Sequence, residues 1–248
     1  MVQYKTEAIV LRSRRYKEAD ALITLLTSER GKVTAVARSV YKPVSKLRGG
    51  VQPYSVNDML LSEGRSALHT LIQSDCLEAL LPIRQSYEAL VLGAYWAELL
   101  DIFGQEDMAD EDLYLIGKAG FYSIAVDPGA LTRMVLEIRL ISQQGLRPDF
   151  QRCCRCGGGL GAGVTISFSS ADGGFLCGDC EASGGRFIKV SSSVRGLWQG
   201  LENMPLDKTG RIRPSRSQAE ELSRVLREWI ARHTGKAMKS WELLKGGS

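Results

Sequence analysis

The stretch EAIVLRSRRYKEADALITLLTSERGKVTAVARSV, residues 7–40, contains three short apolar runs separated by turn-forming residues. Runs of this length, rich in β-branched and aliphatic residues, are typical of strands, and the SERG segment favours a turn between the second and the third. Two similar runs follow, SVNDMLLSE at 55–63 and ALHTLIQSD at 67–75. Five strands in so short a span predict a small closed barrel.

The first strand suggests how this barrel divides its residues between core and surface. Alternation along TEAIVLRSR places Ile9 and Leu11 on one face. Val10, Arg12 and Arg14 then share the other face, so that one face is expected to be core and the other to carry charge. The strand number and size favour a five-stranded OB-fold, although an SH3-like barrel would give much the same pattern.

After Pro82 the apolar residues take helical spacing. Three expected helices lie in SYEALVLGAYWAELLDIFG, DEDLYLIGKAGFYSIAV and ALTRMVLEIRLISQQG, residues 86–104, 110–126 and 130–145. The predicted fold class is therefore α+β. We expect an OB-fold nucleic-acid-binding domain over 1–82 and a helical domain over 83–248, with a zinc-binding insertion at about 150–187.

A further helix is expected over SQAEELSRVLREWIARH, residues 217–233. Ser217 and Glu220 stand in capping-box register at its start. Its apolar stripe includes Trp229 and His233, which predicts that both side chains lie in the core.

Composition narrows the class of protein. The 248 residues are 44% hydrophobic, which is ordinary for a folded chain, and no apolar run is long enough to cross a bilayer. The N-terminus lacks the apolar region of a secretory signal, so we expect a cytoplasmic protein with no membrane partner. The formal charge is only +4, but residues 1–50 hold eleven lysines and arginines against four carboxylates.

The strongest local signal is a pair of C-x2-C motifs in CCRCGGGLGAGVTISFSSADGGFLCGDC. Two-residue spacing lets both thiolates of a motif reach one tetrahedral ion, so Cys153, Cys156, Cys177 and Cys180 are predicted to hold one structural Zn²⁺. Four sulfurs close the coordination sphere, whereas a catalytic zinc keeps one position open for water. Disulfides and a thioredoxin-type redox pair are the alternatives, which the cytoplasmic expectation and the two matched motifs disfavour.

The run from Arg30 to Asn57 contains no carboxylate. It is either a solvated face or a surface for an anion, and nearby tyrosines that could stack on bases favour nucleic acid. We find no catalytic arrangement of serine, histidine and carboxylate and no phosphate loop, so no enzyme activity is expected. The candidate nucleic-acid-binding residues are Arg12, Arg14, Arg15, Tyr16, Lys17, Arg30, Lys32, Arg38, Tyr41, Lys42, Lys46 and Arg48.

The order of motifs along nearly the whole chain resembles the RecO family of bacterial DNA repair and recombination mediators. The matching pieces are EAIVLRSRRYKEADALITLLTSERGKVTAVARSV, KPVSKLRGGVQPYSV, LEIRLISQQGLRPDFQRCCRCGG, GGFLCGDC and GKAMKSWELL. The chain departs from the family at Ser39, where glycine is usual and where a different loop conformation would alter the path of DNA past Arg38, and at Cys154.

The resemblance implies an OB-fold, a helical bundle and an embedded zinc module that act without catalysis. It also implies binding to single- and double-stranded DNA, annealing of complementary strands, and a nucleoid-associated location. The implied protein partners are single-stranded-DNA-binding protein, a RecR-like protein and, indirectly, RecA recombinase, which the protein would help to load.

One partner site is suggested by charge. The tail of single-stranded-DNA-binding protein is acidic and apolar in this resemblance and is engaged by the helical domain, yet residues 85–152 hold five cations against eleven carboxylates. The tail therefore needs a local basic pocket, and Arg133 and Arg139 are the candidates. Two other functions remain open, an RNA-binding OB-fold protein and a zinc-dependent nucleic-acid-processing enzyme.

Overall fold

The computed structural model describes residues 2–64, 67–161, 165–235 and 238–245. Contacts within the chain form two compact units, one of Met1–Pro128 with Met238–Ser248 and one of Gly129–Ala237. This division by contacts differs from the expected domains, 1–82 and 83–248. Whether those two segments fold independently stays a prediction.

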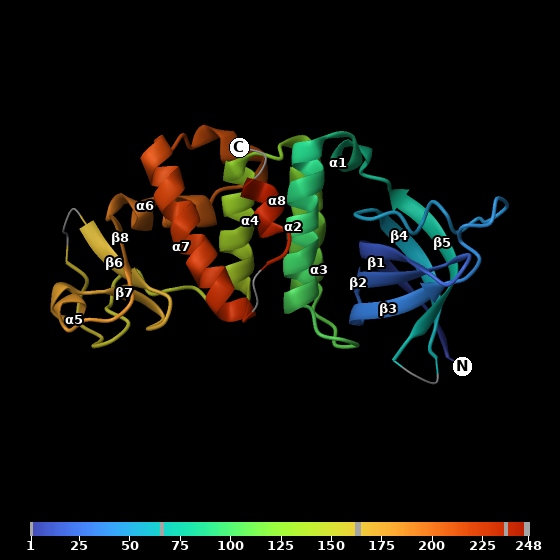
Figure 1. The fold of residues 1–248 in the computed structure, drawn as a ribbon, viewed down its shortest axis with the longest axis horizontal. Coiled ribbons are helices and arrows are strands. Elements are labelled where there is room, and N and C mark those ends of the chain that lie inside the picture. Colours follow the sequence, from blue (N-terminus) through green and yellow to red (C-terminus); the bar gives the residue numbers. More distant parts are fainter. Residues whose placement is uncertain (1, 65–66, 162–164, 236–237, 246–248) are drawn as a thin grey trace. The chain divides into compact units, whose positions relative to one another are not determined.

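The N-terminal strands of the first unit form a closed barrel (Figure 1). Around the ring the order is β1-β2-β3-β5-β4, with β3 and β5 parallel and the other neighbours antiparallel. This closed five-stranded ring confirms the predicted OB-like barrel. The strands are β1 (Gln3–Tyr16), β2 (Asp20–Thr27), β3 (Gly31–Ala37), β4 (Val56–Ser62) and β5 (His69–Glu78).

The predicted faces of the first strand are wrong at one point. Val10 is fully buried in the barrel core, and the pairing with β2 shifts register between Val10 and Arg12. Val10 therefore lies opposite Leu25 and Arg12 opposite Thr24, so the two residues point to opposite sides of the sheet. This bulge lets one strand contribute to the core and then turn its arginines outward.

Three helices follow the barrel in the same unit: α1 (Leu81–Gln85), α2 (Tyr87–Phe103) and α3 (Glu111–Val126). α2 and α3 run side by side next to the barrel (Figure 1). Tyr54, in the loop before β4, stacks on Phe121 of α3 with ring centroids 5.4 Å apart. The C-terminal α8 (Trp241–Lys245) returns to this unit, where Trp241 contacts Tyr95 of α2.

The second unit contains α4 (Ala130–Gln143), α6 (Ser193–Glu202), the 3-10 helix η1 (Leu206–Arg211) and α7 (Arg216–Thr234). The capping box of α7 uses Ser215 and Gln218, two residues before the predicted Ser217 and Glu220. His233 is exposed rather than in the core, because it lies beyond the last buried residue of the helix and only its ring contacts Trp229. Among the helices in the described part of the chain, none is long and apolar enough to cross a membrane.

A small sheet carries the cysteine-rich segment of the second unit. Its strands are β6 (Thr165–Ser169), β7 (Gly174–Leu176) and β8 (Ile188–Ser191), and their order in the sheet is β7-β6-β8. The short helix α5 (Gly178–Ala182) connects β7 to β8 in the sequence. Aromatic contacts join this sheet to the helices of its unit: Phe168 packs on Trp229, with centroids 5.4 Å apart. The cysteine segment is therefore built onto a packed apolar base.

Candidate nucleic-acid interface and metal centre

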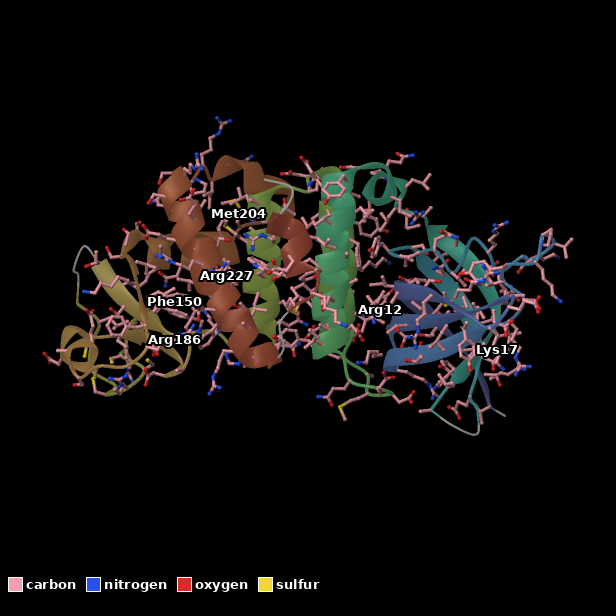
Figure 2. The ribbon with its side chains drawn as sticks, in the orientation of Figure 1. Arg12, Lys17, Phe150, Arg186, Met204 and Arg227 are labelled. Atoms are coloured by element: carbon pink, nitrogen blue, oxygen red, sulfur yellow. The ribbon has the colours of Figure 1, made fainter. Side chains whose placement is uncertain are left out.

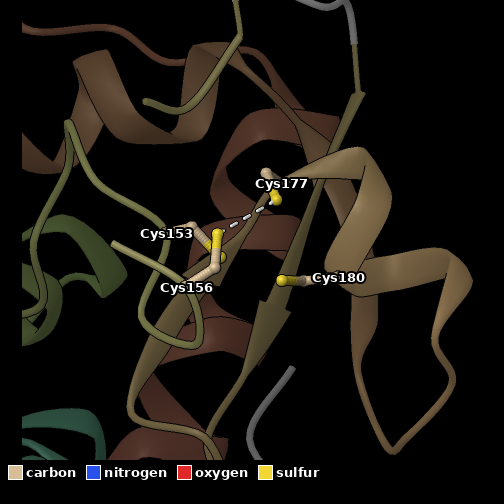
Figure 3. A group of neighbouring side chains, drawn as sticks. All are labelled: Cys153, Cys156, Cys177 and Cys180. Carbon is tan, nitrogen blue, oxygen red and sulfur yellow. Dashed lines mark hydrogen bonds between the residues drawn. The ribbon is translucent and has the colours of Figure 1, made fainter. Parts of the chain in front are cut away.

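The structure brings the four cysteines of the two motifs together (Figure 3). All four Sγ atoms lie within 4.8 Å of one another, and those of Cys156 and Cys177 are 3.6 Å apart. A tetrahedral site with metal–sulfur bonds of about 2.3 Å places its sulfurs about 3.8 Å apart. The cluster therefore fits a tetrahedral ion with no further ligand.

Backbone geometry shapes each motif for this purpose. In the first motif the Gly157 N–H donates to the Cys153 carbonyl at 2.9 Å, and Gly157 has φ +73°, a left-handed conformation that favours glycine. In the second motif the Glu181 N–H donates to the Cys177 carbonyl at 2.9 Å, at the start of α5. Each motif is thus held in a turn by a backbone hydrogen bond to the carbonyl of its first cysteine.

Electrostatics favour a thiolate at Cys153. Burial raises the pKa of this thiol, but backbone N–H groups of both motifs point at its sulfur and lower the pKa to about 6. Thiolates are the form in which cysteine binds metal. Cys154, between the ligands in sequence, is different, because burial and the neighbouring Cys153 raise its pKa to about 11.

Arg155 joins the two motifs and was missed by the sequence analysis. Its guanidinium forms a bidentate pair with Asp172, at 2.9 and 3.2 Å, and donates to the carbonyls of Cys180 at 2.7 Å and Gly184 at 3.1 Å. The side chain thus ties the first motif to the end of the second. Its position inside a C-x2-C motif was visible in the sequence, but its partners were not.

Three of the candidate DNA-binding cations are paired within the protein. Arg30 forms a 2.5 Å ion pair with Glu63 and covers the ring of Tyr4. Asp101 of α2 pairs with Arg12 and Lys32, each at 3.3 Å. These cations help to hold the barrel together or to hold it against α2.

Five other cations form a surface that we call the basic barrel end. Each is exposed, and none has an ion-pair partner among the residues described. They come from the last part of β1, the residue after β3 and the loop between β3 and β4. The basic barrel end consists of Arg14, Arg38, Lys42, Lys46 and Arg48.

The two remaining candidate cations, Arg15 and Lys17, each lie against the ring of a tyrosine. Tyr41 is 38% exposed, and the guanidinium of Arg15 lies 5.5 Å from the centre of its ring. The ammonium group of Lys17 likewise lies 5.5 Å from the centre of the Tyr16 ring. Figure 2 shows Lys17 at the end of the barrel away from α2 and α3, with Arg12 on the side that faces them.

The loop that carries three of these cations is anchored to the barrel. Val40 and Val51 are buried in its core at either end of the loop. Ser39, where the sequence departs from the related family, has φ +54° and donates its N–H to Asp20 at 2.7 Å. Ser39 thus adopts the left-handed conformation that glycine favours. The backbone therefore still turns beside Arg38, although serine stands where the related family usually has glycine.

The two arginines suggested for an acidic peptide lie on α4 in the second unit. Arg133 is 8% exposed and pairs with the buried Glu137 at 2.7 Å, so its charge is already engaged. Arg139 is half-buried, and burial lowers its pKa. Its guanidinium donates to the carbonyl of Met204, while its Nε is buried without a hydrogen-bond partner among the described residues.

Comparison with known proteins connects this geometry to a function. The family model described as "Recombination protein O N terminal" matches residues 1–80, and "Recombination protein O C terminal" matches residues 84–242. A DNA repair protein RecO of Desulforamulus reducens is 32% identical over 97% of this chain and 93% of its own length. The corresponding proteins of Pelotomaculum thermopropionicum and Desulforudis audaxviator are each 31% identical, over 98% and 99% of this chain and 94% and 97% of their own lengths.

Proposed function

Because the chain belongs to the RecO family of DNA repair proteins, we propose that it is a non-catalytic recombination mediator. It binds single- and double-stranded DNA and anneals complementary strands. It also helps to load RecA recombinase onto single-stranded DNA covered by single-stranded-DNA-binding protein, together with a RecR-like partner. These steps place it in the cytoplasm at the nucleoid.

The observation that carries this proposal is the basic barrel end. Five exposed cations, which form no ion pair with any residue that the structure describes, attract phosphate irrespective of base sequence, and Tyr16 and Tyr41 offer faces on which bases stack. A mediator has to accept strands of any sequence, which this combination provides. Arg12, Arg30 and Lys32 contribute less than the sequence suggested, because their charges are shared with carboxylates.

Strand annealing tests the proposal. We expect replacement of Arg14, Arg38, Lys42 and Arg48 by alanine to slow annealing of complementary oligonucleotides at least about tenfold, since several phosphate contacts are lost together. A matched control replaces Lys208, Arg211, Arg213 and Arg232, four exposed cations of the second unit that form no ion pair in the described part of the chain, and should anneal nearly as fast as the wild type. Equal loss in both variants would mean that net charge alone drives binding and would count against the basic barrel end.

An RNA-binding role is the second candidate, since the same cations and tyrosines serve either nucleic acid. Affinities for DNA and RNA oligomers of matched sequence distinguish the two. We expect DNA to bind at least as tightly as RNA, and clear preference for RNA would contradict a role in DNA repair.

We further propose that the cysteine cluster holds one structural zinc ion. Four thiolates with tetrahedral spacing leave no position for a catalytic water. Elemental analysis of protein purified without chelators should find about one zinc per chain. Absence of zinc, or a disulfide between these cysteines under reducing conditions, would refute the assignment.

For the acidic tail of single-stranded-DNA-binding protein, Arg139 remains our candidate. Arg133 is a weaker one, because binding an outside carboxylate would require breaking its buried pair with Glu137. Charge reversal at Arg139 should weaken binding of the tail peptide. Unchanged binding would direct the search to the basic residues nearer the C-terminus.

A further inference from the structure

An apolar stripe on α3 faces solvent within the first unit. Its residues follow the spacing i, i+4, i+7 and i+11, which places them in one line along the helix over about 16 Å. The inward face of the same helix is occupied separately, for Gly117 and Gly120 lie against α2. We call the outward line the apolar seam: Leu115 (53% exposed), Ala119, Tyr122 (36%) and Val126 (87%).

A row of carboxylates crosses the outer surface of the neighbouring strands. Pairing places Glu7 of β1 opposite Asp58 of β4, and Asp58 opposite Asp75 of β5. Like charges directly opposite one another destabilise a sheet. Only Glu7 has a cation, Lys118 of α3 at 2.5 Å, and no ion pair involves Asp58 or Asp75 in the described part of the chain. We call Glu7, Asp58 and Asp75 the acidic row.

The apolar seam and the acidic row border one another. Tyr114 and Lys118 of α3 both contact the Glu7 carboxylate, at 2.6 and 2.5 Å. One turn further along the helix, Tyr122 meets Glu78 at the end of β5, and burial together with this carboxylate raises the pKa of the tyrosine. Lys5 lies on the same face of β1, two residues from Glu7, and is the one further cation on this stretch of the strand.

We propose that the apolar seam and the acidic row form a docking site for a basic amphipathic helix of a partner protein. A helix with apolar residues at matching spacing would cover the seam, and arginines or lysines on one flank would meet Asp58 and Asp75. Charge decides the class of partner, because the row repels both nucleic acid and acidic peptides. The site is therefore separate from the basic barrel end and does not depend on the proposed function.

The test uses the full chain and a synthetic helical peptide as the probe. The labelled peptide is roughly 18 residues long so that it forms a stable helix, with leucines at the spacing of the seam and arginines on one flank. A second peptide carries glutamates in place of the arginines. Fluorescence anisotropy should show binding of the basic peptide, weakening with salt, and no binding of the acidic one.

Two double variants separate the components of the site. Asp58→Asn with Asp75→Asn should weaken binding about tenfold or more and flatten its salt dependence, whereas Leu115→Ser with Val126→Ser should weaken it similarly while keeping the salt dependence. The matched control, Glu18→Gln with Glu29→Gln, removes two exposed carboxylates elsewhere on the barrel and should bind as the wild type does. Circular dichroism verifies that each variant is folded.

Three results would overturn the proposal. They are failure of the basic peptide to bind, equal binding of the acidic peptide, and wild-type affinity in both double variants. Sedimentation velocity supplies a further check, since a dimer that dissociates in the Leu115→Ser, Val126→Ser variant would assign the seam to a second copy of the chain instead. Affinity for single-stranded DNA, measured in the same samples, should stay unchanged in the Asp58→Asn, Asp75→Asn variant and in the Leu115→Ser, Val126→Ser variant.

Discussion

Arg155 is the side chain that joins the two cysteine motifs. It holds Asp172 and the carbonyl of Cys180, so its loss should free the second motif to move relative to the first. We expect Arg155→Ala to lower zinc affinity about 10- to 100-fold, as removal of partners around metal ligands does. Competition with a chromogenic chelator measures this. Arg152→Ala, at the neighbouring exposed arginine, is the control, and equal zinc release by the two variants would show that Arg155 has no special role.

Glu7 links β1 to α3 and makes stability depend on pH. Burial raises the pKa of its carboxyl, but hydrogen bonds from Lys118 and Tyr114 outweigh burial and lower the pKa below its ordinary value. Its contribution is therefore present above about pH 4.3, where the unfolded carboxyl is ionised, and is lost as pH falls through the lower folded value. Glu7→Gln should lower the urea midpoint at pH 7 and have a smaller effect near pH 3. An effect that grows on acidification would contradict this sign.

The sequence predicts the role of a side chain only where that role depends on neighbours in sequence. The clustering of the four cysteines was predictable because two-residue spacing is a local requirement of a metal-binding motif. The roles of Arg155, Glu7 and Asp101 were not, since each depends on a partner brought close by folding, 17, 111 and 89 residues away. The same applies to Arg30 and Lys32, whose neutralising carboxylates lie outside the acid-free run.

α3 packs on α2 through glycines, although glycine is a poor helix former and alanine would form the helix more readily. A Cβ at Gly120 would lie 2.4 Å from Nε1 of Trp96, a buried ring that donates to the Gly117 carbonyl. We expect Gly120→Ala to destabilise the protein by about 1–3 kcal/mol through overpacking, although alanine is the better helix former. Gly196→Ala in α6, where a Cβ meets nothing within 4 Å, should be neutral or stabilise by up to about 1 kcal/mol. Chemical denaturation compares them, and equal effects would refute the packing argument.

The helices and strands themselves were largely predictable. The expected helix over 86–104 corresponds to Tyr87–Phe103, because its capping serine and terminating glycine are local signals. The start of α7 was placed two residues late, since Ser215 with Gln218 and Ser217 with Glu220 both satisfy the capping pattern. The bulge after Val10 left no signal in the alternation, and the sheet β6–β8 was obscured by the glycine-rich composition around it.

Charge is separated over the first unit in a way that the overall +4 conceals. Cations with no ion pair in the described part of the chain lie at the end of the barrel, on the last residues of β1 and in the β3–β4 loop. Carboxylates cross β1, β4 and β5 beside α3. The two surfaces that we propose, one for phosphate and one for a basic helix, therefore lie on different parts of one barrel.

The salt dependence of single-stranded DNA binding shows whether the basic barrel end holds phosphates. If about five phosphates are neutralised, a plot of log affinity against log salt should have a slope of roughly −3.5, since each contact on a single strand contributes about −0.7. Replacing Arg14, Arg38, Lys42 and Arg48 by alanine should flatten this slope by up to ~3 and weaken all sequences about equally. If the folded quadruple variant kept the wild-type affinity and slope, the basic barrel end would not hold phosphates, and its cations would be only a solvated surface.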